Sequence, residues 1–361
     1  MKKFTGFILA IMIFSSIELF AVKIKIDADT PGNQTDLNQF ASLLINESDL
    51  AKIGNQKKLA EGMGNAAAYA GSNVASFSGY EGYDVFAIMW GLSAGVVIPP
   101  NPDSIDTMIE EEKDLDAGAG LSSAFNLGIN LTGLGLDILP NRLYMNIKGA
   151  TASVKGTISD DEDGDKDWSF KMSTFGLGLN YQLVDRGGDR FKVFKWTGLS
   201  LGSGFIYTRN KIVFDADFDE YYASDLTPSG TTPPTIGGKD ITVEPRAQFG
   251  IDVKTYTIPI EISTSARLLW LFNFTLGGGV DLQFGSSKII VTSVADVKTI
   301  DNAKVGTAHI DGTTKGKPTF LNPKIMTGFG ICLGPIPVDV RATYYPATDG
   351  AAVNVGLGFV W

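Results

Sequence analysis

The sequence is poor in the residues that carry most catalytic and metal chemistry. It holds one cysteine, Cys332, and one histidine, His309. A single cysteine excludes an intramolecular disulfide framework and a cysteine-rich metal site. A nucleophile–histidine pair needs an imidazole held against Ser or Cys, and His309 lies in an expected loop. We therefore predict that the chain is not an enzyme and binds no cofactor.

Long apolar runs and clusters of positive charge are also scarce. The run from Phe7 to Phe14 follows Lys2 and Lys3 and is too short to cross a membrane as a helix. Together with Ala21, this pattern predicts a signal peptide over residues 1–21. The net charge of −10, with no offsetting Lys/Arg cluster, argues against nucleic acid as a partner.

What the sequence has instead is long alternation of apolar and polar residues. From Phe86 to Ile98 every second residue is apolar, and the runs continue for about 12–20 residues, whereas strands of globular proteins cluster near 5–6. Alternation of this length predicts membrane-spanning strands with a lipid face and a lumen face. The expected strands lie near residues 83–98, 119–135, 142–157, 168–184, 193–215, 241–267, 274–294, 318–333, 336–346 and 351–361.

The connections between these strands alternate between long and short, except that the last one, 347–350, is short where a long one is expected. This alternation, with an even strand number, is typical of outer-membrane barrels, which have short periplasmic turns and long outer loops. We predict an all-β fold: one antiparallel transmembrane β-barrel over residues 83–361, with about ten strands, or 12 to 14 if some are missed.

The long loops are acidic. We interpret loop 160–167 as a solvated tip, with a calcium site as the alternative, because it lacks the EF-hand order of ligands.

Residues 241–267 change phase in the middle. The apolar set ends at Val253 and resumes at Tyr256, without turn residues between them. A single strand with one extra residue in a β-bulge explains this change without a reversal of chain direction.

Charged residues within the strands are expected to face the barrel interior. A Lys or Arg in the lipid midplane costs roughly 2–4 kcal/mol, so such residues line water or pair with one another. The two alternatives are ion pairs that stiffen the interior and a hydrated, charge-lined pore. The phase of each strand predicts that this set points inward: Lys148, Glu244, Arg246, Asp252, Lys254, Glu261, Arg267, Asp281, Lys324, Asp339 and Arg341.

Residues 22–82 differ from the barrel. Leu37, Phe40 and Leu44 form an apolar stripe at helical spacing, and a second short helix is expected before Gly62. We predict a plug or periplasmic segment that gates a path through the barrel. A narrow barrel would hold most of it at the periplasmic mouth, with Asn65 to Ser78 best able to enter.

The chain ends on an apolar strand with no polar tail. Such an edge invites aggregation unless it is paired into a closed barrel in lipid. The ending resembles the C-terminal signal by which outer-membrane proteins are recognised by the barrel assembly machinery, carried here by Asn354, Gly356, Phe359 and Trp361. The resemblance implies an outer membrane of a diderm bacterium, with outer-membrane lipids and that machinery as partners.

Two further stretches resemble known families. The long segment before the barrel, with the small-residue run from Gly64 to Ala70, resembles the long-chain fatty-acid transporters of outer membranes, although Ala66 stands where that family has proline. Residues 256–260 and 284–287 are similar to spirochaetal outer-membrane proteins. The resemblance to the fatty-acid transporters implies passage of small or hydrophobic solutes. The alternative is a surface adhesin whose acidic loops bind host surface components.

Overall fold

The structure is a computed structural model that describes most of the chain. The described residues are 23–47, 57–76, 83–98, 117–135, 142–160, 164–184, 193–217, 220–269 and 271–361. The expected signal peptide, the acidic stretch 103–116 and residues 161–163 of the second acidic loop lie outside them.

Ten of the described strands form a closed antiparallel ring, as the alternation predicted. The ring closes because β11 pairs with β10 on one side and with β13 on the other. Its members in ring order are β2 (Phe86–Val97), β3 (Gly118–Asn130), β4 (Leu143–Asp160), β5 (Gly164–Val184), β6 (Phe194–Asp217), β10 (Arg246–Leu268), β11 (Phe272–Thr299), β13 (Leu321–Leu333), β14 (Ile336–Tyr345) and β15 (Gly350–Val360). A closed ring leaves no unpaired edge in lipid.

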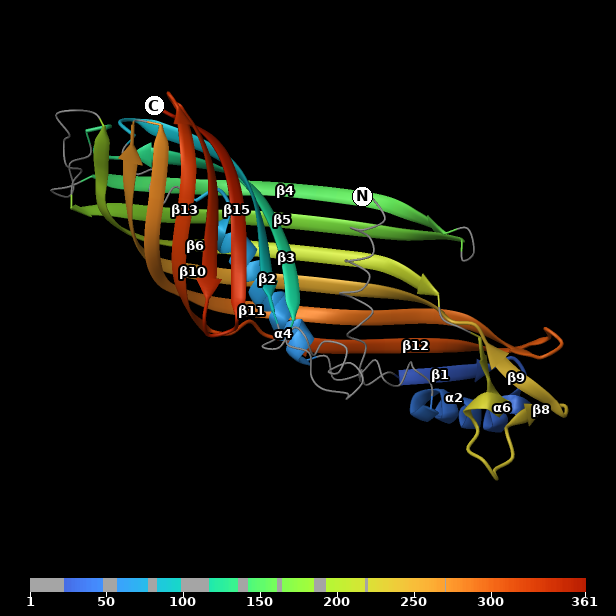
Figure 1. Ribbon diagram of the computed structural model, residues 1–361. Helices are drawn as coiled ribbons and strands as arrows, with labels where there is room; N and C mark the ends of the chain where they lie inside the picture. Colours follow the sequence, from blue (N-terminus) through green and yellow to red (C-terminus); the bar gives the residue numbers. More distant parts are fainter. Residues whose placement is uncertain are drawn as a thin grey trace.

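Five of these strands, β4, β5, β6, β10 and β11, continue beyond the ring as an open sheet (Figure 1). The first half of β11 pairs with β13, and its second half, from Ser287, pairs with β12 (Lys304–Gly316). The strand β1 (Lys23–Ala28) adds to the far side of β12. The sequence prediction treated residues 295–317 as a loop, but they contain the end of β11 and all of β12.

The apolar face changes sides along these long strands. The register of β10 is continuous with both neighbours from Ala247 to Thr257, so the expected bulge at Val253–Tyr256 is wrong. The outer face is apolar where it meets lipid and polar where the strand has left the membrane. On this outer face Asp252 pairs with Arg209, with an Oδ2–Nη2 distance of 3.1 Å. The outer face of β5 shows the same change, reading Asp167, Ser169, Lys171 and Ser173, then Phe175, Leu177 and Leu179.

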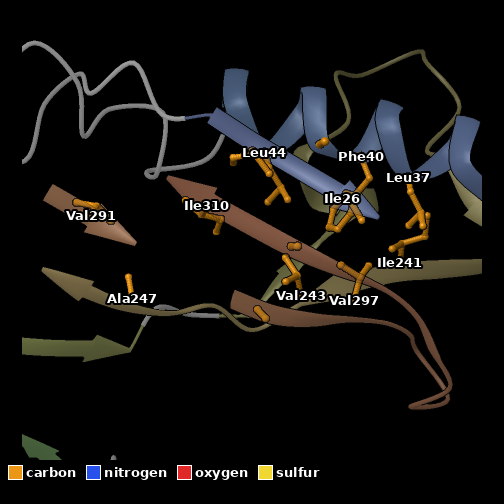
Figure 2. Close-up of a cluster of buried hydrophobic side chains, with 14 of the residues drawn as sticks. Ile26, Leu37, Phe40, Leu44, Ile241, Val243, Ala247, Val291, Val297 and Ile310 are labelled. Carbon is orange, nitrogen blue, oxygen red and sulfur yellow. The ribbon is translucent and has the colours of Figure 1, made fainter. Parts of the chain in front are cut away.

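The inner face beyond the membrane is correspondingly apolar and is covered by a helix. The helix α2 (Gln34–Glu47) buries Leu37, Phe40 and Leu44 against this face, as its stripe predicted (Figure 2). Burial of each such side chain contributes roughly 1.5–3 kcal/mol. The sheet contributes Phe249, Ile289, Val291, Val297 and Ile310, and β1 contributes Ile24 and Ile26.

Smaller elements complete this outer layer, which we define as β1, α2, the open sheet and the segment from residue 220 to 243. The segment holds β7 (Tyr221–Tyr222), α6 (Ala223–Leu226), β8 (Thr235–Ile236) and β9 (Lys239–Val243), and η1 (Pro31–Asn33) precedes α2. The hydroxyls of Tyr222 and Thr242 donate to Glu220 and hold the pKa of its carboxyl below the usual value. Because Tyr222 and Thr242 lie on β7 and β9, Glu220 ties the two strands together.

The outer layer and the C terminus lie at opposite ends of the barrel (Figure 1). The Trp361 carbonyl accepts from the Val85 amide at 3.1 Å, at the end with the short turns, whereas β1 and α2 lie at the end with the long connections. Short turns mark the periplasmic side of such barrels. The expectation that most of residues 22–82 lies at the periplasmic mouth is therefore wrong. The outer layer supplies the apolar surface that α2 needs.

The apolar belt and the closed ring together make the protein an integral outer-membrane β-barrel. The belt consists of half-exposed apolar side chains on the outer faces, such as Trp90, Leu177 and Val355. Among the described helices, none is long and apolar enough to span a membrane.

Candidate functional site

The lumen of the barrel holds the helix α4 (Lys57–Asn73). Every residue of α4 from Gly62 to Asn73 is buried. The wall fits the helix closely: a Cβ on Gly95 would lie 2.2 Å from the Ala66 carbonyl oxygen, and one on Gly120 would lie 2.5 Å from Ala67. A narrow barrel therefore accepts the helix only because both surfaces carry small residues. The expectation that Asn65 to Ser78 enter the barrel agrees with this placement as far as Ser76, and residues 77 and 78 lie outside the described residues.

A pair of stacked tyrosines holds the middle of α4 to the wall. The rings of Tyr69 and Tyr345 lie 3.7 Å apart with 12° between their planes. The Tyr69 hydroxyl donates to Asn322 at 3.1 Å and lies 2.5 Å from the Thr348 hydroxyl. Asn73 donates to the Tyr345 hydroxyl at 2.8 Å, one helical turn further along.

A buried charge cluster lies beside the same turn of the helix. Lys324 pairs with Asp281, with an Nζ–Oδ1 distance of 2.7 Å, and also with Glu261. The Tyr345 hydroxyl donates to the other oxygen of Asp281 at 3.0 Å. Two carboxylates around one ammonium, with a hydroxyl donor, give the cluster the paired geometry that a buried charge requires. The Ser72 hydroxyl lies 3.5 Å from the Lys324 ammonium, so the cluster reaches the helix.

The C-terminal end of α4 is capped by side chains of the wall. The Lys148 ammonium donates to the carbonyl oxygens of Ser72 and Val74 at 3.3 and 3.1 Å. A positive charge at a helix C terminus also interacts favourably with the helix dipole. The next residue, Ala75, has a φ of +48°, a left-handed conformation that ends helices and is uncommon outside glycine.

Two asparagines fix this unusual residue. Asn126 donates to the Ala75 carbonyl at 2.7 Å, and the Ala75 amide donates to Asn354 at 3.2 Å. Asn354, predicted as part of the assembly signal, thus contacts the plug helix from the inner face of β15. Its contact could not be deduced from the C-terminal motif, because only the alternation of β15 marks it as inward.

A small polar cavity lies beside the end of α4, against β4, β5, β6 and β10. Its volume is about 60 Å³, enough for a few water molecules. Its lining is mainly polar and small, and includes Lys148, Glu261, Asn126, Asn146, Asn180 and several glycines. The lumen at this point therefore offers polar groups with which water can form hydrogen bonds.

The predicted lumen-lining residues divide into two groups. The side chains of Asp281, Lys324, Asp339 and Arg341 are buried inside the ring, and Arg341 donates to Asp339 at 2.7 Å. Glu261 is part of the cluster above, and Arg267 lies on the inner face near the periplasmic end of β10.

Lys148, which caps α4, also lies inside, whereas the other four charged residues of that prediction lie outside the lumen. Arg246 is exposed at the start of β10, beyond the membrane, and Glu244 precedes the strand and is exposed. Asp252 and Lys254 lie on the outer face of β10. The assumed bulge assigned them to the wrong face, because the pattern reverses where the strand leaves lipid. Phe359 and Trp361 are on the outer side, exposed toward lipid.

No metal site accompanies this arrangement in the part of the chain that the structure describes, where no three His, Cys, Asp or Glu side chains gather as ligands. In the cluster around Lys324 the ammonium already lies against both carboxylates, in the position that a cation would take. The wall of the lumen carries paired charges, amides and hydroxyls. These groups can form hydrogen bonds with a helix or with a polar solute.

Comparison with known proteins identifies a family. The family model described as Lsa36-like matches residues 21–361, so the chain belongs to the Lsa36-like family. No curated protein matches the chain.

Among solved structures, the transport unit of the autotransporter AIDA-I from Escherichia coli has 10% identity, covers 78% of this chain and 91% of its own, and has a TM-score of 0.28. The toluene transporter TbuX from Ralstonia pickettii has 11% identity, 84% and 97% coverage, and a TM-score of 0.26. A FadL homologue from Pseudomonas aeruginosa has 9% identity, 83% and 96% coverage, and a TM-score of 0.24. At such TM-scores the likenesses carry no argument about function.

Proposed function

We propose that this protein is an outer-membrane channel that α4 closes and that admits small polar solutes when α4 leaves the lumen. The observation that carries the proposal is the chemistry of the contact between α4 and the wall. Tyr69, Ser72 and Asn73 of the helix meet hydroxyl, amide and ammonium groups of the strands. These polar contacts lie beside apolar contacts that Met63, Ala66 and Ala67 of the helix make with the wall.

The hydrogen-bonded part of this contact can open at low cost. When α4 leaves, water can replace its hydrogen bonds to the wall, and the net contribution of each is only about 0.5–1.5 kcal/mol. The helix α2 is different, because undocking it would expose Leu37, Phe40 and Leu44 to water. The two helices therefore suit two tasks: α2 is an anchor and α4 a plug.

The composition of the wall favours polar over hydrophobic solutes. Along the inner face of β10 within the ring, polar residues such as Thr255, Thr257, Glu261, Ser263 and Ser265 recur, interrupted by Pro259. A hydrophobic solute gains little from such a path, whereas a hydrated solute keeps its hydrogen bonds. The charges of both signs around Lys324 give no strong preference for anions or cations.

Two deletions test the proposal. Removal of residues 24–78, with the preceding leader kept, is expected to raise conductance in planar bilayers and permeability to small polar solutes. Removal of residues 24–47 alone leaves α4 in the chain and is the matched control, expected to stay closed. Heat-modifiability on mild SDS gels shows whether each variant has assembled. An assembled 24–78 deletion with unchanged permeability to polar and hydrophobic solutes would contradict gating.

The outer layer favours a second function, adhesion at the cell surface. Strands that continue past the lipid and build their own core with α2 present a folded surface on the side of the long connections. In this alternative the barrel is an anchor and α4 is a permanent plug. Retention of cells on a panel of immobilised extracellular-matrix proteins, lost with the 24–47 deletion while the bilayer stays sealed, would favour adhesion.

A further inference from the structure

The path of the chain through the barrel has a consequence for its export. The strand β2 begins at the periplasmic end, where Trp361 also lies, since the Trp361 amide donates to the Phe86 carbonyl at 2.9 Å. The helix α4 runs antiparallel to β2: the wall at Gly91 is level with Ala75, and the wall at Gly95 is level with Ala66. The C-terminal end of α4 thus lies nearer the periplasmic end of the barrel, and its start lies nearer the outer end.

At the outer end, the start of α4 joins the outer layer. Leu59 and Ala60 belong to the same apolar cluster as α2 and the open sheet. Still earlier in the chain, β1 is hydrogen-bonded along its full length to β12, from Lys23 with Asp311 to Ala28 with Gly306. The first described residues are therefore fixed on the side of the long connections, and α4, which lies between them and β2 in the sequence, lies along the lumen.

We infer that the barrel exports its own amino-terminal segment through the lumen, so that β1 and α2 are displayed on the cell surface. The two elements β1 and α2 cannot pass in their folded form, because the wall fits α4 closely enough that Gly95 and Gly120 leave no room for a Cβ. The segment passes as an extended chain before β1 joins β12 and before α2 buries its stripe. Formation of the outer core then prevents its return, and the same route accepts an extended polypeptide attached before Lys23.

Single-cysteine labelling tests this inference in the full-length protein. In a Cys332→Ser background, which removes the buried native thiol, Lys23→Cys is the test variant because Lys23 is exposed. Ser229→Cys, exposed in the outer layer, marks the surface, and Pro335→Cys, exposed in the turn between β13 and β14, marks the periplasmic end. The probe is a membrane-impermeant maleimide, applied to intact cells and then to cells with a permeabilised outer membrane.

We expect Lys23→Cys to be labelled on intact cells to the same extent as Ser229→Cys, and Pro335→Cys only after permeabilisation. Labelling of Lys23→Cys only after permeabilisation, in a protein that is heat-modifiable, would overturn the inference. Lys25→Cys, exposed on the same strand, gives a second reading if Lys23→Cys does not assemble. An epitope peptide inserted before Lys23 should likewise be bound by antibody on intact cells, and an epitope held inside would overturn the export route.

Discussion

Truncation of Tyr69 to alanine is the sharpest test of the plug. Tyr69 lies on α4, is fully buried, and joins the helix to the wall through its ring and its hydroxyl. Its replacement removes interactions made only when α4 is docked, so it should shift the equilibrium toward an open lumen without changing a strand.

The size of the shift follows from the ring packing and the hydrogen bonds that alanine cannot make. Truncation of a buried aromatic side chain to alanine costs about 3–5 kcal/mol. Here the lower value applies, because Asn322 and Thr348 make the vacated space polar enough for water to enter and replace the hydrogen bonds of the Tyr69 hydroxyl. A cost of about 3 kcal/mol corresponds to a roughly 100-fold increase in the ratio of undocked to docked helix.

The assay is single-channel recording in planar bilayers, with open probability as the measured quantity. Tyr69→Ala is expected to raise the open probability roughly 100-fold, and Tyr69→Phe, which keeps the stacked ring and loses the hydroxyl, by roughly 10-fold. The matched control is Tyr344→Ala. Tyr344 precedes Tyr345 on β14 but faces outward, with 47% of its surface exposed, so its loss should not affect α4.

One result would refute this reasoning. If assembled Tyr69→Ala has the same open probability as the wild type and Tyr344→Ala, the stacking and hydrogen bonds of Tyr69 do not set the closed state. A rise of equal size in Tyr69→Ala and Tyr344→Ala would point to general loosening of the barrel.

Two other predictions concern the membrane and the C terminus. Leu177→Lys, in the lipid belt of β5, should cost about 2–4 kcal/mol and reduce assembly, whereas Ser169→Lys on the same face beyond the membrane should be near neutral; denaturant titration in lipid vesicles measures both, and equal costs would contradict the membrane boundary. Trp361→Asp should leave the protein unassembled and degraded because it places a charge on the lipid face of the closing strand, and wild-type levels of heat-modifiable protein would show the C-terminal argument to be wrong.

The barrel itself could be predicted from the sequence because lipid and lumen impose opposite requirements on alternate residues. Strands such as β2 and β15 lie wholly within the membrane, so one face stays apolar from end to end, and the alternation locates their bounds closely. The strand number followed from the alternation of short and long connections. Pairing partners of Tyr69 or Lys148 did not follow, since they depend on which wall residues are level with each turn of α4.

The length of α4 could not be predicted from the sequence, and the reason lies in how its glycines pack against the wall. The second helix was expected to end before Gly62, because each glycine in a helix interior costs about 1 kcal/mol relative to alanine. In the structure α4 continues through Gly62 and Gly64 to Asn73. A Cβ on Gly62 would lie 2.2 Å from the Ala117 carbonyl oxygen, so the barrel wall admits no larger residue there. Packing in a narrow lumen therefore overrides helix propensity.

The errors in β10 and in the location of α2 have one physical cause. Alternation reports only which face is apolar, and a strand that leaves the membrane for a folded layer reverses that face without any change in its backbone. If the change between Val253 and Tyr256 is taken as such a boundary, then Phe249 and Val253 must lie on an inner apolar face outside the lipid. That apolar face must be shielded from water by another part of the protein, and the apolar stripe of α2 packs against it. A phase reversal in a long barrel strand thus locates both the edge of the membrane and the docking site of an amphipathic helix.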